Sequence, residues 1–325
     1  MLLFFLLMLV IIPPSDNNNF LACNSLESLN KEQTSIRVSN YSGEFAPVIK
    51  KLLSLAADTS FVYSLIVNPK VKLDASYIKI NVIGSLSKSD YSSQYNDYSV
   101  SKCRRFHCDN IDILEECSLQ FGVPAEVITS ILWIETKHGS STGKHLLPTV
   151  FLSAAMANEQ QYIEMNINEM QKKFNGNQSE LPELEEKIRQ RSKRKSEWAL
   201  NELLALEKIS KTTDINIFNL YGSWAGAFGW SQFLPSSYIN WAVDGNNDNK
   251  IDLFSLEDAA CSIANYLKSN GWSNNKNAQR RAVFHYNNNN AYVDAVLMLA
   301  EKLGHSNPFD EFDEIIQPLN KQIER

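Results

Sequence analysis

Residues 123–139 read VPAEVITSILWIETKHG, and the interpretation of the whole chain starts from this stretch. Pro124 suits the first turn of a helix, and Gly139 suits the position just after its end. Between them, apolar side chains recur with the period of a helix, at Val127, Ile128, Ile131, Leu132 and Ile134. The stretch therefore predicts an apolar helix that ends at Gly139.

One acidic residue, Glu135, lies near the end of this apolar helix, between Ile134 and Thr136. Apolar surroundings raise the pKa of a carboxyl group because desolvation penalises its charged form. A raised pKa suits a general acid that works at neutral pH. A single glutamate near a helix C-terminus is more often a surface or structural residue, so its position alone leaves both interpretations open.

Helical patterns continue on both sides of this stretch. We expect helices over residues 110–121, 150–158, 160–210, 256–270 and 291–303, the third of them interrupted near Gly176 and Pro182. Residues 61–67 and 77–83 fit either strands or short helices. Residues 219–238 are punctuated by glycine. Helices joined by short loops predict a mainly α fold.

Three segments of this chain resemble one known family. They are the stretch at 123–139, the segment GSWAGAFGWSQFLPSSYINWAVDGNNDNKIDLFSLEDAACSIANYL at 222–267, and AVFHYNNNNAYVDAVLMLA at 282–300. Their order and spacing resemble the membrane-bound lytic murein transglycosylase B family. The resemblance implies a lysozyme-like helical catalytic domain, of the goose-lysozyme and soluble lytic transglycosylase type, with an EF-hand-like loop.

The resemblance also implies roles for particular residues. Glu135 would protonate the glycosidic oxygen between N-acetylmuramic acid and N-acetylglucosamine, then accept the proton of the muramoyl C6 hydroxyl as that hydroxyl attacks C1. The product would be a 1,6-anhydro sugar. We found no second catalytic carboxylate in the sequence, in contrast to the two-carboxylate glycosidases.

Substrate-binding roles follow from the same resemblance. Ser223, Gln232 and Tyr286 would line the cleft, and Asn287 would support the turn that presents Tyr286. Glycines would let the backbone approach the substrate, at Gly226 and Gly229. Phe233 and Tyr238 would contact sugar faces, with core packing as the alternative.

A second motif contains regularly spaced oxygen donors, Asp244-x-Asn246-x-Asp248-x-Lys250. Side-chain oxygens at alternate positions, with a backbone carbonyl at the fourth, suit calcium. The family carries an EF-hand-like loop here, and Asp258 matches its late acidic ligand. We therefore expect a structural calcium, and no cofactor for the chemistry. The alternative is an Asn/Asp-rich turn without metal.

The formal net charge of the 325 residues is -6, which argues against a nucleic-acid binder. A local basic run lies within 160–210, at Lys187, Arg189, Arg191, Lys193, Arg194 and Lys195. A solvated helix face is one interpretation, and contact with the carboxylates of a peptide stem is the other. The partner expected from the resemblance is the glycan strand of peptidoglycan, bound by a monomer.

The first residues predict export. Residues 2–12 form an apolar run that fits a signal peptide and is short for a membrane span. An uncleaved membrane anchor and a lipoprotein with Cys23 as the lipidated residue are alternatives, and all three imply a periplasmic enzyme. The expected division is a signal or anchor at 1–22, an N-terminal region at 23–105, a catalytic domain at 106–310 and a tail at 311–325.

Five cysteines are spread along the chain. In an oxidising compartment, Cys103 could pair with Cys108 or with Cys117. A zinc site that includes His107 matches no common spacing and ranks below these pairings. Cys261 lies in an apolar helical pattern and is expected in the core.

The leading hypothesis is thus non-hydrolytic cleavage of peptidoglycan. A binding protein that kept the fold and lost activity is a second hypothesis, and a conventional hydrolase is a third. Product chemistry separates the first from the third, because fold alone does not decide function.

Overall fold

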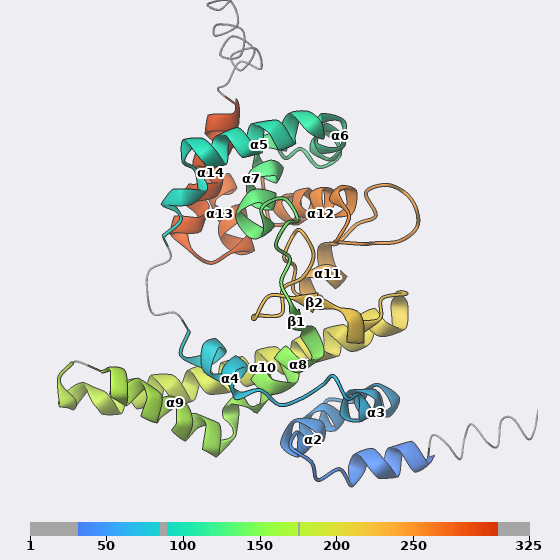
Figure 1. Cartoon of the computed structure of the whole chain (residues 1–325), viewed down its shortest axis with the longest axis vertical. Coiled ribbons are helices and arrows are strands. Elements are labelled where there is room, and N and C mark those ends of the chain that lie inside the picture. The colour runs from blue at the N-terminus through green and yellow to red at the C-terminus, as the bar shows by residue number, and fades with distance from the viewer. Residues whose placement is uncertain (1–31, 85–89, 175, 305–325) are drawn as a thin grey trace, which may run out of the picture. The chain divides into compact units, whose positions relative to one another are not determined.

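The computed structural model describes residues 32–84, 90–174 and 176–304 (Figure 1). The chain divides into two compact units, Met1–Val67 and Asn68–Arg325. The described part of the first unit contains a helix over residues 32–39, followed by α2 (Ala46–Ser54) and α3 (Thr59–Val67), which contact each other. Residues 61–67, which the sequence left open between strand and helix, are helical.

The second unit is almost entirely helical, which confirms the predicted mainly α class. Its elements are α4 (Ala75–Val82), η1 (Ser92–Gln94), α5 (Asp97–Asp109), α6 (Ile111–Phe121), α7 (Ala125–Thr136), β1 (His145–Leu146), α8 (Leu147–Ala155), η2 (Met156–Asn158), α9 (Gln160–Lys173), η3 (Gln178–Glu180), α10 (Leu181–Thr212), η4 (Ile217–Asn219), β2 (Tyr221–Gly222), α11 (Pro235–Trp241), α12 (Leu256–Ser269), α13 (Lys276–Tyr286) and α14 (Asn290–Gly304).

Helix α7 is the centre of one helical group, packed against α5, α6, α12 and α14 (Figure 1). Nine of its 12 residues are buried, among them four of the five apolar positions predicted from the sequence. The fifth, Ile134, is partly buried. Each buried aliphatic side chain contributes about 1.5–3 kcal/mol. The helix ends where Lys137 adopts a left-handed conformation with φ 53°.

A second group forms around α8 and α10, which pack closely on each other and on α4. The short strands β1 and β2 pair antiparallel, with His145 opposite Gly222, and so join the start of α8 to the glycine-rich segment after α10. The predicted interruption of the 160–210 helix is confirmed, since α9 ends at Lys173 and α10 begins at Leu181.

The division of the chain differs from the expected one. The boundary expected between 105 and 106 falls inside α5, an uninterrupted helix whose buried residue Cys103 packs against Trp133 of α7. The structure instead separates the units after Val67. Residues 1–22, Cys23 and 311–325 lie outside the described residues.

Within the described ranges, no single helix combines the length and apolarity needed to cross a bilayer, and one sharply bent pair, α6 with α7, meets that test jointly.

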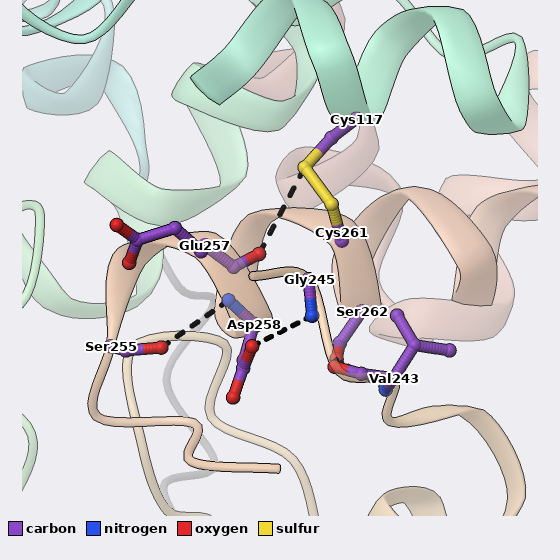
Figure 2. Close-up of a disulfide and its surroundings, with 8 residues drawn as sticks. All are labelled: Cys117, Val243, Gly245, Ser255, Glu257, Asp258, Cys261 and Ser262. Carbon is purple, nitrogen blue, oxygen red and sulfur yellow. Dashed lines mark hydrogen bonds between the residues drawn. A yellow bond between two sulfur atoms is a disulfide. The ribbon is translucent and has the colours of Figure 1, made fainter. Parts of the chain in front are cut away.

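One disulfide joins α6 to α12, between Cys117 and Cys261 (Figure 2). It corrects the expected pairing of Cys103 with Cys108 or with Cys117. Cys261 is buried in the core, as expected, but it is disulfide-bonded there. The partners are 144 residues apart in sequence, but α6 packs along α12, which brings their side chains together. Cys103 is buried and Cys108 exposed, both as free thiols. Cys117 is therefore not free to join a zinc site.

The disulfide should contribute strongly to stability, because it closes a long loop and so restricts the unfolded chain. We expect the Cys117→Ser/Cys261→Ser double variant to lose about 2–5 kcal/mol of unfolding free energy in denaturant titrations. Cys108→Ser is the matched control, because Cys108 is exposed and unpaired. Equal stability of the double variant and the control would contradict this role.

Candidate active site

The carboxyl group of Glu135 lies at the C-terminal end of α7, where that helix meets α14. Its Oε1 accepts a hydrogen bond of 2.6 Å from the hydroxyl of Tyr292. Tyr292 is 1% exposed, so this contact is shielded from water. Glu135 itself keeps part of its surface exposed, which leaves the residue accessible from outside.

Aromatic rings surround this hydrogen bond. The ring of Tyr286 is nearly parallel to that of Tyr292, with centroids 6.4 Å apart, and Tyr91 meets Tyr292 edge-on at 5.7 Å. The Tyr286 hydroxyl donates to the carbonyl oxygen of Ser231. The sequence predicted Tyr286 here but not Tyr91 or Tyr292. Tyr292 carried one signal, since it lies within the matched 282–300 segment on an otherwise apolar helix face.

The protein environment holds the carboxyl group of Glu135 close to neutral. Burial raises its pKa from 4.5 to about 7, opposed by the Tyr292 hydrogen bond and by the positive charge of Lys137. Burial, followed by the charge of Glu135, raises the pKa values of Tyr286 and Tyr292 well above 10. Near neutral pH the group can therefore give up or take a proton.

Residues 221–233 form a glycine-rich hairpin that is tied to the end of α7. Thr136, the neighbour of Glu135, donates a hydrogen bond of 3.1 Å to the carbonyl oxygen of Trp230. Gly226 has φ 80°, and a Cβ there would lie 2.2 Å from the Phe151 ring. Close packing on α8 therefore accounts for glycine at this position. Gly229 is likewise packed against Leu253.

The predicted polar residues of this hairpin make internal hydrogen bonds. The Oγ of Ser223 accepts from the backbone N–H of Ala227 at 3.1 Å. Gln232 has φ 49°, and its Nε2 donates to the carbonyl oxygens of Gly229 and Thr142 at 2.9 and 3.2 Å. Both side chains are partly exposed, so they remain within reach of a ligand.

The predicted aromatic residues of this region are buried. Phe233 is 2% exposed and packs near Tyr266 and Tyr286, and Tyr238 is 5% exposed with its hydroxyl donating to the Ile251 carbonyl. This burial favours the core-packing alternative for both. Asn287 is the residue after the last turn of α13, and its backbone N–H closes that turn.

A second buried carboxyl group, which the sequence did not indicate, belongs to Glu202 on α10. Its two oxygens accept from the backbone N–H and the hydroxyl of Ser236, at 2.9 and 2.7 Å. Both oxygens are thus used to hold the start of α11. This arrangement indicates a structural role and leaves Glu135 as the candidate acid.

The loop at 244–258 is held by its own acidic side chains. Asp244 accepts from the backbone N–H groups of Asp248 and Asn249, at 3.1 and 2.7 Å. Asp258, which is 1% exposed, accepts a hydrogen bond of 2.7 Å from the backbone N–H of Gly245 (Figure 2). It also accepts one of 2.6 Å from the backbone N–H of Asp252, so it ties the start of the loop to its middle. Burial raises the pKa of Asp258, and the charges of Asp244 and Asp248 add to that rise.

These donors are the hard oxygens that calcium prefers, and an excess of negative charge surrounds Asp258. In the described residues, however, no three carboxylate, histidine or cysteine groups converge as a metal site. Each carboxylate oxygen has a second lone pair, so the hydrogen bonds of Asp258 do not prevent it from binding a cation. The predicted donors Asp244, Asn246, Asp248 and Lys250 follow one another along one exposed turn.

Comparison with known proteins gives one family. A model described as the transglycosylase SLT domain matches residues 71–292. The membrane-bound lytic murein transglycosylase B of Escherichia coli (strain K12) is 31% identical over 161 residues. That alignment covers 50% of this chain and 35% of the relative, so the chain spans well under two thirds of the relative's length.

Two solved structures share the fold. The E. coli lytic transglycosylase SLT35 in complex with bulgecin A gives a TM-score of 0.62 at 19% identity, over 83% of this chain and 98% of that one. SltB3 from Pseudomonas aeruginosa in complex with NAG-NAM-pentapeptide gives 0.59 at 20%, over 79% and 78%. Other structures of these two proteins contain calcium and NAG-anhNAM-pentapeptide, respectively. The likeness confirms the predicted lysozyme-like transglycosylase fold.

The raised pKa of Glu135 makes a prediction about stability. A carboxyl group whose pKa is higher in the folded state stabilises the fold at low pH, and this contribution is lost as pH rises from about 4.5 to about 7. Glu135→Gln cannot ionise. We therefore expect its unfolding free energy, relative to the native protein, to be greater at about pH 9 than at about pH 5 by on the order of 2–3 kcal/mol.

Denaturant titrations at the two pH values test this expectation. Glu115→Gln, on the exposed face of α6, is the matched control and should show no such pH dependence. An equal effect of Glu135→Gln at both pH values would mean that the carboxyl group is not desolvated.

Proposed function

The chain belongs to the transglycosylase SLT domain family, and on this premise we propose that it is a lytic transglycosylase that cleaves peptidoglycan without hydrolysis. The bond cleaved joins N-acetylmuramic acid to N-acetylglucosamine, and the products end in 1,6-anhydromuramic acid. Glu135 is the general acid and then the general base.

The observation that carries this proposal is the isolation of Glu135. Among the described residues, the groups that set its pKa besides burial are Tyr292 and Lys137, and neither is a carboxylate. Two-carboxylate glycosidases place their second carboxyl group about 5–10 Å from the acid, as nucleophile or as base for water. Glu202 is engaged with Ser236. A single acid therefore supports a mechanism in which the substrate supplies its own nucleophile.

The proposed reaction uses that one carboxyl group twice. Protonated Glu135 gives its proton to the glycosidic oxygen, and the bond from that oxygen to muramoyl C1 breaks. The resulting carboxylate takes the proton of the muramoyl C6 hydroxyl as O6 bonds to C1, which restores the acid. Because O6 belongs to the same sugar, it is held near C1 and replaces water as the nucleophile. A pKa near neutrality suits both proton transfers.

Neighbouring groups keep the carboxyl group ready for both steps. The Tyr292 hydroxyl fixes the orientation of the carboxyl group and stabilises the carboxylate formed after the first transfer. Tyr286 and Tyr91 hold the Tyr292 ring in place. We assign Ser223 and Gln232 to hydrogen bonds with sugar hydroxyl or acetamide groups, since both are partly exposed on the hairpin that is tied to α7.

Structures of a related protein with bound peptidoglycan fragments support the substrate class. SltB3 has been solved with NAG-NAM-pentapeptide and with NAG-anhNAM-pentapeptide, and the relative in E. coli is described as membrane-bound. We infer for this chain a peptidoglycan strand as partner, export to the periplasm, membrane attachment through its N-terminus, and action as a monomer.

Product analysis tests the reaction. Mass spectrometry of soluble fragments released from purified peptidoglycan should show anhydromuropeptides with the native protein. Glu135→Gln should reduce their release at least about a thousandfold, since it removes both proton transfers, each worth about 10²–10⁴-fold. Glu115→Gln should retain activity.

Other products would change the assignment. Fragments with reducing ends would make the protein a hydrolase on this fold. No release by the native protein would favour a binding protein, and release by Glu135→Gln would remove Glu135 from the mechanism.

We further propose that the 244–258 loop holds a structural calcium. The ligands would be Asp244, Asn246, Asp248, the carbonyl of Lys250 and Asp258, and the chemistry needs no cofactor. A cation here offsets the mutual repulsion of Asp244, Asp248 and Asp258. The loop also forms internal hydrogen bonds, so calcium would stabilise a loop conformation that these bonds already support.

Removing calcium should therefore lower stability and leave the chemistry intact. We expect the melting temperature to fall by several degrees in chelator, to recover with calcium, and to respond little to magnesium, which tolerates this geometry poorly. Asp248→Asn should weaken the calcium effect. A melting temperature that ignores both chelator and added calcium would contradict the site.

A further inference from the structure

A cavity of about 660 Å³ lies on the side of α7 that carries Trp133 and Lys137. Its walls come from the end of α7, the start of α5, and the residues around η1. None of the residues assigned above to sugar binding lines it. The lining residues that matter here are Tyr98, Lys102, Trp133, Lys137 and Ser140.

Two ammonium groups border this cavity, each over an aromatic ring. The Nζ of Lys137 lies 4.6 Å from the centre of the Trp133 ring, and the Nζ of Lys102 lies 5.5 Å from that of Tyr98. In the described part of the chain, neither lysine forms an ion pair with an acidic residue. Because these two cations border the cavity and no acidic residue neutralises them, the cavity favours an anionic ligand.

Lys137 is positioned by the backbone and has donor capacity to spare. It occupies the left-handed position that ends α7, and its Nζ donates to the Trp133 carbonyl at 3.0 Å and to the side-chain oxygen of Gln94. An ammonium group has three N–H donors, so one is left for a ligand. Trp133 lines the same wall and is 7% exposed, so its ring offers the cavity an apolar edge.

The aromatic rings narrow the class of anion. Tyr98 is largely exposed, and its ring lies 6.5 Å from that of Trp133, so the two form an apolar surface between the cations. A free inorganic anion would leave this surface unused. A carboxylate carried on an aliphatic chain would use both the charges and the rings.

This cavity is electrostatically connected to the proposed acid. Burial raises the pKa of Glu135 and lowers that of Lys137, and the charge of each residue partly opposes the shift of the other. The other ionisable groups that act on one or the other are Tyr292, Tyr286, Cys103 and His138. Of these, Cys103 and the tyrosines are neutral near pH 7, and burial lowers the pKa of His138 to about 4, so it is neutral as well.

We propose that this cavity binds a carboxylate of the peptidoglycan stem peptide, held between Lys102 and Lys137 against the rings of Tyr98 and Trp133. The inference rests on the proposed function, because it names a further part of that substrate. Occupancy also acts on the reaction. A bound carboxylate offsets the charge of Lys137 and so favours protonated Glu135, the form that starts cleavage.

Reciprocity makes this effect measurable without turnover. If the bound peptide favours protonated Glu135, then protonation of Glu135 must strengthen peptide binding by the same factor. The probe is the stem pentapeptide without sugars, titrated calorimetrically into the full chain. Its N-terminus is acetylated, because a free α-amino group titrates at about pH 8. The peptide carboxylates stay ionised between about pH 6 and about pH 8.5, so they do not cause the pH dependence.

We expect the native protein to bind the pentapeptide roughly fivefold more tightly at about pH 6 than at about pH 8.5. Glu135→Gln, which is neutral at both, should bind equally well at both. Lys137→Gln and Lys102→Gln should each weaken binding by roughly fivefold or more. Lys208→Gln, an exposed lysine of α10 outside the cavity, is the matched control and should bind as the native protein does.

Several results would overturn the inference. These are absence of binding to the native protein, equal binding of a pentapeptide with amidated carboxylates, and unchanged binding by both cavity-lysine variants. Lys102 is exposed, so its variant remains informative even if Lys137→Gln fails to fold. Binding that is independent of pH would overturn the link to Glu135. Peptide binding without anhydromuropeptide products would refute the proposed function and leave the cavity site in place.

Discussion

The active-site region is organised around one carboxyl group, that of Glu135, which lies at the end of α7 and has little contact with water. Desolvation makes the charged form of Glu135 costly, and the Tyr292 hydroxyl reduces that cost. Tyr292 is in turn held by Tyr286, whose hydroxyl reaches the hairpin at Ser231. Trp230 of the hairpin accepts a hydrogen bond from Thr136 of α7. The contacts that position the acid therefore link α7, α14, α13 and the hairpin to one another.

Much of the fold could be predicted because helices and their ends leave local patterns in the sequence. The apolar period of 123–139 predicted α7, and the interruption near Gly176 predicted the break between α9 and α10. Long-range pairings leave no such pattern. The sequence offers several partners for Cys117, and only the packing of α6 on α12 selects Cys261. The unit boundary after Val67 was missed for a similar reason, since the contacts that join α4 to α8 and α10 cross long stretches of sequence.

The site could be predicted from the sequence only where a residue type by itself suggests a chemical role. An acid in an apolar helix indicated Glu135, but its hydrogen-bond partner lies 157 residues away and required the fold. Phe233 and Tyr238 could not be assigned in this way, because an aromatic residue in a glycine-rich stretch can either contact a sugar or pack in the core. In the structure both are buried. Lys137 is close to Glu135 in the sequence, but that its charge acts on the carboxyl group follows only from the structure, where it takes the left-handed position that ends α7.

The Cys117–Cys261 bond has a topological consequence. The residues between the two cysteines form a covalent ring that includes α7 with Glu135, the β1–β2 pair and the 244–258 loop. A single break in the backbone anywhere inside this ring leaves both pieces attached to each other. A break before Cys117 or after Cys261 separates them. The turn between α9 and α10 lies inside the ring, so a protease that nicks it would not divide the molecule unless the bond were also reduced.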